Sequence, residues 1–138
     1  MKFEEKKANL FNFEKEYALA HCISSDYALG AGIAVDFNKK YHLKNNLQQM
    51  GSGTYPDCIY INGVFNLVTK KKYWNKPTYD SLQKSLAMMK EQAIELGILK
   101  IAMPKIGCGL DRLQWSQVRE IIKNIFEDTD IEILICNL

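Results

Sequence analysis

Two glycine-bearing segments of the chain have the residue types that a phosphate-binding loop needs. Ala28-Leu-Gly-Ala-Gly-Ile33 and Lys105-Ile-Gly-Cys-Gly-Leu110 each follow an apolar run and precede a stretch with helical spacing. Glycine lets backbone N–H groups come close to phosphate oxygens, and a helix N-terminus adds a favourable dipole. A glycine often makes only a tight turn, however, and neither segment matches the dinucleotide-binding or P-loop pattern. The two segments therefore leave a phosphate site and a pair of tight turns as equal alternatives.

Side chains that could act as an acid, a base or a nucleophile lie beside these segments or at the ends of apolar runs. Asp111 directly follows the second glycine segment, where Asp111-x-x-Gln114 fits a capping box, and the spacing alone favours a helix cap over chemistry. Lys70 opens the run Lys70-Lys-Lys72, which is either a solvated turn or a weak phosphate contact. Because Lys70 alone continues the strand pattern before it, it could be held where the sheet ends. Ser24 follows another apolar run, where a serine often does no more than end a strand.

Nucleic-acid binding is a separate possibility for the lysine run. The formal net charge of +2 is too small to indicate it by itself. A nucleic-acid-binding module would use Lys70 to Lys72, and it predicts a steep salt dependence of binding to unmodified DNA. Tyr73 and Trp74, which follow the lysines, would either pack a loop or form an aromatic wall for a base, and we favour packing.

The composition is that of one globular domain in a reducing compartment. The chain has 138 residues, which suits a single domain over residues 1–138 with one core. Its four cysteines form no CxxC pair and only two histidines could join them, so we expect no metal site and reduced thiols. No apolar run approaches the roughly 20 residues that span a bilayer, and the charged Met1-Lys-Phe-Glu-Glu-Lys-Lys7 does not resemble a signal peptide. We therefore expect a cytoplasmic, monomeric protein with no membrane partner.

The periodicity of the chain predicts strands that alternate with helices. Residues 17–23 are apolar almost throughout, which is typical of a strand covered on both faces, as in a parallel sheet. Asn62-Gly63 is a strong hairpin signal, because both positions of such a turn need a positive φ. Pro77-Thr78 begins a long helix that Gly97 ends. The remaining predicted elements are strands at 3–7, 58–61, 64–69, 100–103 and 131–136, and helices at 33–41, 43–50 and 113–126. This pattern indicates a mixed, mostly parallel sheet between helical layers.

A set of segments that occur in order along the chain carries a resemblance to a known family. The segments are His21-Cys-Ile-Ser24, Gly30-Ala-Gly-Ile-Ala-Val35, Thr69-Lys-Lys71, Lys76-Pro-Thr-Tyr79, Leu82-Gln-Lys-Ser-Leu86, Met103-Pro104 and Ile106-Gly-Cys-Gly-Leu-Asp-Arg-Leu-Gln-Trp115. Their sequences and spacing resemble those of a macrodomain, and closely those of its terminal ADP-ribose protein glycohydrolase branch. The resemblance implies an α/β fold of three layers, α/β/α, with a mixed, mostly parallel sheet of about six strands.

The resemblance also implies an ADP-ribose ligand and a set of site residues. In this family the lysine that matches Lys70 attacks the anomeric carbon of the distal ribose. The aspartate that matches Asp111 assists and then resolves the covalent adduct, and the serine that matches Ser24 helps to organise the site. The amine must lose its proton before it attacks, and partial burial or the neighbouring Lys71 and Lys72 would favour that loss. The diphosphate would lie between the two glycine segments. The expected ADP-ribose-binding residues are Asn9, Leu10, Gly30, Ala31, Gly32, Ile33, Ala34, Thr69, Ile106, Gly107, Cys108, Gly109 and Leu110.

The chain departs from the family pattern at two places. Ala8-Asn-Leu-Phe11 stands where the family usually has Gly-Asp-Leu-Phe. The aspartate of that family pattern contacts the adenine amino group. Asn9 must therefore accept from this group through its side-chain carbonyl, without charge assistance, or the contact weakens. Trp74 and Asn75 stand where the family usually has a small residue and a histidine, which affects the acceptor side.

Two functions follow from the resemblance. The first is a hydrolase that removes mono-ADP-ribose from an ester-linked protein carboxylate or a modified nucleobase through a covalent lysine intermediate, with no cofactor. Its partners would be ADP-ribose and ADP-ribosylated protein or ADP-ribosylated DNA. The alternative is a non-catalytic reader that only binds ADP-ribose. Because a reader has no use for a nucleophile and a resolving acid, the presence of both Lys70 and Asp111 favours the hydrolase.

Overall fold

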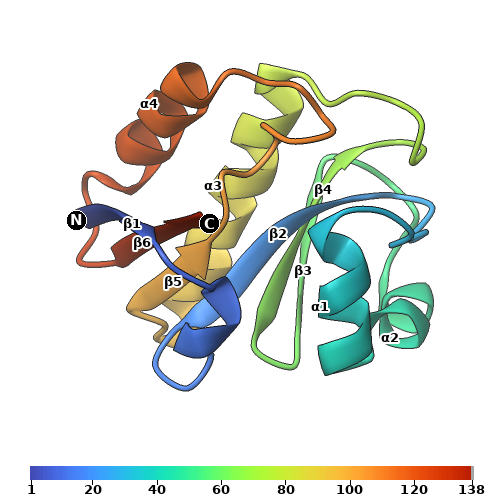
Figure 1. Ribbon diagram of the computed structural model, residues 1–138, viewed down its shortest axis with the longest axis horizontal. Coiled ribbons are helices and arrows are strands. Elements are labelled where there is room, and N and C mark those ends of the chain that lie inside the picture. Colours follow the sequence, from blue (N-terminus) through green and yellow to red (C-terminus); the bar gives the residue numbers. More distant parts are fainter. Residues whose placement is uncertain (138) are drawn as a thin grey trace.

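The computed structural model describes residues 1–137 and contains one six-stranded sheet with helices on both faces (Figure 1). The strands are β1 (Lys2–Lys7), β2 (Ala18–Ser24), β3 (Asp57–Ile61), β4 (Val64–Lys70), β5 (Lys100–Met103) and β6 (Glu132–Asn137), in the spatial order β1-β6-β5-β2-β4-β3. The helices are a short 3-10 helix η1 (Leu10–Phe13), α1 (Ile33–Tyr41), α2 (Leu43–Met50), α3 (Tyr79–Leu96) and α4 (Trp115–Phe126). All neighbouring strands are parallel except β3 and β4, which confirms the predicted mixed, mostly parallel sheet.

The hairpin and the long helix follow from local sequence signals. Asn62 and Gly63 have φ values of 51° and 83°, as their dipeptide predicts, and they join β3 to the antiparallel β4. Thr78 caps α3 in a capping box with Ser81, and Gly97 ends the helix in the left-handed conformation with φ 72°. The hairpin therefore sets where β4 begins, and α3 packs on one face of that strand.

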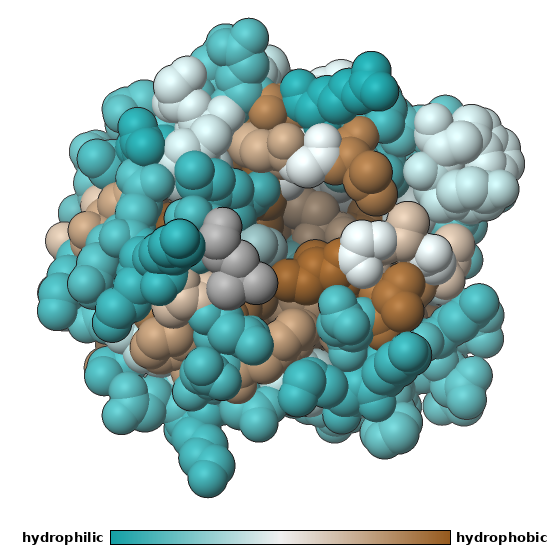
Figure 2. All heavy atoms as spheres, viewed as in Figure 1, coloured by the Kyte–Doolittle hydropathy of each residue, from teal (hydrophilic) through white to brown (hydrophobic). Residues whose placement is uncertain are grey.

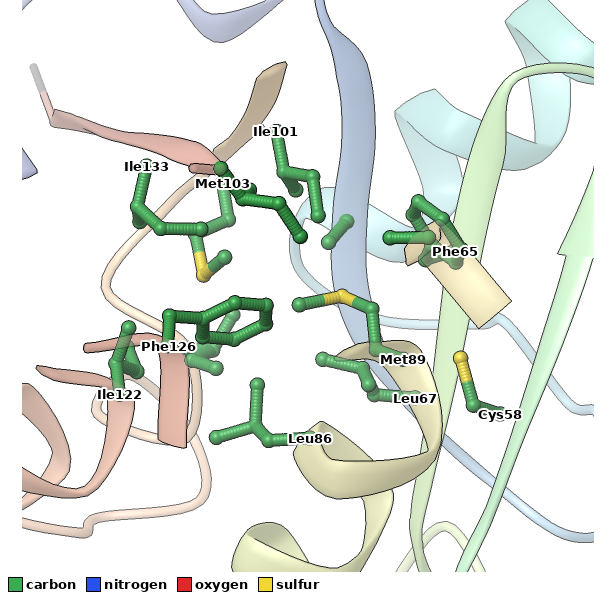
Figure 3. Packing of buried hydrophobic residues seen from close by; sticks show 14 of the residues in the cluster. Cys58, Phe65, Leu67, Leu86, Met89, Ile101, Met103, Ile122, Phe126 and Ile133 are labelled. Carbon is green, nitrogen blue, oxygen red and sulfur yellow. The ribbon is translucent and has the colours of Figure 1, made fainter. Parts of the chain in front are cut away.

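Two apolar clusters, one on each face of the sheet, hold the layers together. On one face, α3 and α4 contribute Leu86, Met89, Ile122 and Phe126, which point toward the buried side chains of the sheet in Figure 3. On the other face, α1 and α2 bury Phe37, Leu43 and Leu47. The side chains of these helical residues are fully buried, and burial of each large apolar side chain contributes roughly 1.5–3 kcal/mol. The three-layer α/β/α prediction is confirmed.

One predicted boundary and one predicted cap are wrong. The helical spacing after residue 113 predicted a helix from Leu113, but α4 begins at Trp115 with Gln114 as its N-cap, and no side chain caps it. Asp111 lies outside the helix and its carboxylate bonds elsewhere, so the capping-box interpretation fails. The reason is that Arg112 has a positive φ of 62°, which turns the chain before the helix begins. Within residues 1–137, no helix is both long and apolar enough to cross a membrane.

Candidate active site

A cleft of about 1080 Å³ opens where β2, β4 and β5 end. Figure 2 shows a hollow in this face, between the loop that precedes α1 and the loop that precedes α4, with hydrophobic residues on its walls. Both glycine segments line the cleft, as do residues at the ends of β2 and β4. The predicted site residues in its wall are Ser24, Gly30, Ala31, Gly32, Ile33, Ala34, Lys70, Ile106, Gly107, Gly109, Leu110 and Asp111. We call it the glycine-lined cleft.

The glycines of the two loops are present for different reasons. Gly32, the N-cap of α1, and Gly107 have φ values of 60° and 72°, which side-chain-bearing residues rarely adopt. Gly30 and Gly109 do not have a positive φ, so their backbone conformation does not require glycine. An added Cβ at Gly109 would meet no other atom of residues 1–137 within 4 Å, and at Gly30 it would meet only the carbonyl of Ala28 at 3.9 Å. The fold itself therefore tolerates a side chain at Gly30 and Gly109, and a ligand that approaches the backbone gives a reason for its absence.

The first loop presents main-chain donors to the cleft. Gly32 supplies no side-chain cap, and the Val35 N–H donates to the Gly32 carbonyl at 3.3 Å. The N–H groups of Ile33 and Ala34 are therefore the ones that neither the helix nor the cap residue's side chain satisfies. Tyr27 and Leu29 have left-handed φ values of 54° and 48°, a conformation that costs energy and concentrates at functional loops. This loop and the start of α1 can together hold an anion through backbone N–H groups and the helix dipole.

Lys70 and Asp111 meet at one end of the cleft. The Lys70 Nζ donates to Asp111 Oδ1 at 2.6 Å, and each side chain is only 13% exposed. The sequence suggested Lys71 and Lys72 as the charges that act on Lys70, but the charge in direct contact with it is the Asp111 carboxylate. A lysine and a carboxylate in contact, largely shielded from water, form a proton-transfer pair that can supply a nucleophilic amine.

A bulge at the end of β4 aims Lys70. Ile23 of β2 pairs with Val68, but the next residue, Ser24, pairs with Lys70, so Thr69 is an extra residue in β4. Such bulges redirect the following side chain and are frequent beside active sites. The bulge is held on one side by Ser81 Oγ of α3, which donates to the Thr69 carbonyl at 2.7 Å. On the β2 side, the N–H of Ser25 donates to the Lys70 carbonyl at 2.9 Å.

Asp26 is a site residue that the sequence did not single out. Its Oδ1 accepts from Ser24 Oγ and from the Ala28 N–H at 3.2 Å, and its Oδ2 accepts from the Tyr73 N–H at 3.0 Å. Partial burial acts to raise the pKa of Asp26, but the hydrogen bonds that it accepts outweigh burial and hold the pKa below its usual value. An Asp side chain that accepts from the N–H group two residues later forms an Asx-turn. The tendency of Asp to form such a turn is the one signal in the sequence that could have pointed to Asp26. Asp26 thereby ties the loop after β2 to the loop after β4.

Lys76 also joins the site without having been predicted. Its Nζ donates to the Leu110 carbonyl at 2.6 Å, which connects the loop after β4 to the second glycine loop. The hydroxyl of Tyr79 accepts from the N–H of Gln114 at 3.0 Å and supports the same loop from α3. These contacts hold the loop that carries Asp111 in place, with the Asp111 carboxylate next to the Lys70 amine.

Two thiols near the cleft are disfavoured as nucleophiles by their surroundings. Cys22 lines the cleft, and burial together with the negative charge of Asp111 raises the pKa of its thiol far above the usual range. Burial also raises the pKa of Cys108. A raised pKa disfavours the thiolate form of both side chains. Among residues 1–137, no group of three or more His, Cys, Asp or Glu side chains could hold a metal ion.

Four predicted ADP-ribose contacts lie outside the wall of the cleft: Asn9, Leu10, Thr69 and Cys108. Leu10 and Thr69 are buried. The side chain of Asn9 accepts from the Phe11 N–H at 3.0 Å and caps η1. The binding roles of these four residues stay predictions.

Comparison with known proteins decides the family. The model of the Macro domain family matches residues 52–122. The human protein named ADP-ribose glycohydrolase OARD1 is 47% identical over 138 residues, which cover 96% of this chain and 89% of the human protein. The chain belongs to the macrodomain family. The bovine protein of the same name is 46% identical to this macrodomain over the same shares of both chains.

Solved structures agree with this macrodomain in fold. The macrodomain of Mycobacterium tuberculosis DarG superposes with a TM-score of 0.87 at 19% identity, over 99% of this chain and 97% of that one. Thermosipho africanus DarTG, solved in complex with ADP-ribose, gives a TM-score of 0.83 at 16% identity over 100% of this chain and 42% of that chain. At these identities the likeness concerns the fold alone.

Proposed function

We propose that this macrodomain is an ADP-ribosyl hydrolase that removes mono-ADP-ribose from an ester-linked protein carboxylate or a modified nucleobase. The observation that carries the proposal is the contact of Lys70 Nζ with Asp111 Oδ1 at 2.6 Å at one end of the glycine-lined cleft. The names of the human and bovine relatives, at 47% and 46% identity, support the activity. A reader that only binds ADP-ribose has no use for this pair.

In the proposed complex, the diphosphate lies between the two glycine loops. Main-chain N–H groups at the start of α1 and around Gly109 would bind its oxygens, and the open space at Gly30 and Gly109 would admit it. The Asn9 Oδ1 already accepts one hydrogen bond from Phe11, and its second lone pair would accept from the adenine amino group. The distal ribose would then lie against Lys70, with Ser24 beside it.

The proposed reaction begins with a proton transfer from the Lys70 ammonium to Asp111. The Nζ lone pair then forms a bond to the anomeric carbon, and the bond from that carbon to the acceptor breaks. An ester acceptor leaves as a carboxylate, and a nucleobase linked through a ring nitrogen leaves as the nitrogen anion, which takes up a proton from solvent. The ribose ring opens as its oxygen takes a proton from nitrogen, which leaves a protonated Schiff base on Lys70. Asp111 gives its proton to solvent and becomes a base again.

Hydrolysis of the adduct completes the cycle. Asp111 takes a proton from a water molecule as the water oxygen bonds to the anomeric carbon, and it passes this proton to Nζ. As the carbon–nitrogen bond breaks, the proton of the new hydroxyl group also passes to Nζ through Asp111, which leaves an aldehyde that closes to the ribose ring. Free ADP-ribose and the Lys70 ammonium result, and an ester substrate releases one proton overall. Ser24, held by Asp26, would orient the distal ribose.

The test uses variants of the two reacting residues. We expect Lys70→Ala to abolish release of ADP-ribose from an ester-linked peptide while ADP-ribose binding, measured by calorimetry, is largely kept. Lys70→Arg should fail as well, because a guanidinium stays protonated. Asp111→Ala should accumulate a covalent adduct that intact-protein mass spectrometry detects. Full release by Lys70→Ala would refute the lysine mechanism, and binding without release by the unaltered chain would favour the reader.

A further inference from the structure

The loop that carries Asp111 is closed at its base, while its tip makes few bonds of its own. We call residues 107–113 the Asp111 loop and residues 109–112 its tip. At the base, the N–H of Leu113 donates to the Gly107 carbonyl at 2.7 Å. The one backbone-to-backbone hydrogen bond that the tip makes with any of residues 1–137 stays within the tip. The position of the tip therefore depends on bonds that involve side chains.

Two lysines connect the tip to the rest of the protein. Lys70 Nζ donates to Asp111 Oδ1, and Lys76 Nζ donates to the carbonyl of Leu110, each at 2.6 Å. In the part of the chain that the structure describes, no other side-chain hydrogen bond or ion pair joins the tip to a residue outside it. Since Leu110 directly precedes Asp111, Lys76 holds the backbone next to the carboxylate.

Both lysines take their positions from the first turn of α3. In that turn, Ser81 Oγ donates to the carbonyl of Thr69, the residue before Lys70, at 2.7 Å. The same oxygen accepts from the N–H of Thr78 at 3.0 Å, two residues after Lys76. The proposed nucleophile and the lysine that holds the Asp111 loop are therefore positioned relative to one buried serine.

The contact between Lys70 and Asp111 changes during the proposed reaction, whereas the bond from Lys76 does not. The Lys70 nitrogen gives up a proton and becomes part of the adduct, and Asp111 must then bond to a water molecule. The Lys76 ammonium takes no part in these bond changes, so it can hold the Leu110 carbonyl throughout the cycle. Hydrolysis of the adduct therefore depends on Lys76 more than formation does, because Lys70 itself holds Asp111 before the first step.

We propose that Lys76 is a positioning residue that keeps Asp111 in place while the lysine adduct is hydrolysed. It acts through the backbone of Leu110 and not on the reacting atoms. The inference rests on the proposed function, because it assigns a residue to one step of that reaction. Lys76 is exposed, so water can satisfy the Leu110 carbonyl when the ammonium is removed. A variant therefore loses the position of the tip and keeps the stability of the fold.

Rapid-quench mass spectrometry with an ester-linked ADP-ribosylated peptide measures the rates at which the covalent adduct forms and decays. We expect Lys76→Met, which keeps an unbranched side chain, to slow decay roughly tenfold and to change formation by less than about threefold, as for one lost hydrogen bond to a charged group. Lys76→Arg should restore decay, because a guanidinium also donates to a carbonyl. Lys84→Met is the matched control and should change neither rate, since Lys84 pairs with Asp80 on α3 at 3.0 Å and is not in the wall of the cleft.

Amide hydrogen exchange tests the positioning without turnover, which separates it from the proposed function. In Lys70→Ala, where Asp111 has lost its partner, adding Lys76→Met should speed exchange of the Arg112 N–H in the tip roughly tenfold, while the Leu113 N–H at the base exchanges as before. Failure of the unaltered chain to release ADP-ribose would refute the proposed function and the step assigned to Lys76, even if exchange in the tip is faster. Release with unchanged adduct decay in Lys76→Met, equal slowing of formation and decay, or unchanged exchange in the double variant would overturn the role of Lys76 alone.

Discussion

The buried His21 on β2 should make the free energy of unfolding of this macrodomain fall as the pH is lowered from 6.5 to about 4. The side chain is fully buried, its ring stacks on Phe37, and Nε2 lies 2.6 Å from Asn66 Oδ1. The amide of Asn66 donates to the carbonyls of Ile59 and Val64, so its oxygen must accept from the His21 ring. The proton of the neutral ring is therefore on Nε2, and Nδ1 is left without a partner within residues 1–137.

The size of the change in unfolding free energy follows from the difference between the pKa of His21 in the unfolded and in the folded chain. Burial lowers the pKa of His21 from 6.5 to about 4, and the contact with Asn66 opposes this only in part. As the pH falls below 6.5, the unfolded chain takes up a proton at this residue while the folded chain does not, until the pH reaches about 4. At about 1.4 kcal/mol for each pKa unit, the free energy of unfolding falls by about 3 kcal/mol across this window. The contribution is fully present above pH 6.5 and lost below about pH 4.

Urea unfolding at several pH values between 7.5 and 4 tests this prediction. His21→Gln keeps a donor for Asn66 but cannot titrate in this range, so the difference in unfolding free energy between the parent and this variant isolates His21. That difference should shift by about 3 kcal/mol in favour of the variant as the pH falls. His42→Asn is the matched control, because it replaces a histidine that is exposed and lies outside the core. A difference between the parent and His21→Gln that stays constant with pH would refute the reasoning.

Two further predictions concern the loops that shape the cleft. In Gly51→Ala the new Cβ would lie 1.9 Å from the hydroxyl oxygen of the buried Tyr27, so we expect a loss of about 1–3 kcal/mol in unfolding free energy and weaker ADP-ribose binding, measured by urea unfolding and calorimetry. Parent-like values for both would show that Tyr27 does not support the loop. In Asp26→Asn the amide nitrogen cannot accept from the Tyr73 N–H, so the rate of ADP-ribose release should fall roughly tenfold, as expected when a hydrogen bond to a charged group is lost. An unchanged rate together with unchanged urea stability would contradict the role given to Asp26.

The sequence could predict the elements whose causes are local. Asn62-Gly63 specified the hairpin, Thr78 and Gly97 bounded α3, and the apolar run before Ser24 became β2. In each case a short-range rule of φ, capping or periodicity decides the outcome, and no distant contact opposes it. The start of α4 was missed because Arg112 takes a left-handed φ, which no local signal in that residue announces.

The site depended on contacts between residues far apart in the chain. Asp111 had a plausible local partner three residues on, but its partner in the structure is Lys70, 41 residues away. Asp26 and the Tyr73 N–H that it accepts are 47 residues apart. The spacing of a motif cannot reveal such pairs, and only the family resemblance pointed to Lys70 and Asp111 together. Loop packing was favoured for Trp74 over an aromatic wall, and in the structure this side chain is 63% exposed and contacts the ring of Tyr73.

The position of β6 leaves the sheet incomplete until this strand is in place. This strand is the last in the chain, yet it lies between β1, the first, and β5. Until the ribosome has released β6, β1 has no neighbour in the sheet and β5 has an open edge just ahead of the loop that carries Asp111. A nascent chain therefore holds Lys70 and Asp111 on an unfinished sheet until β6 has paired with both of its neighbours.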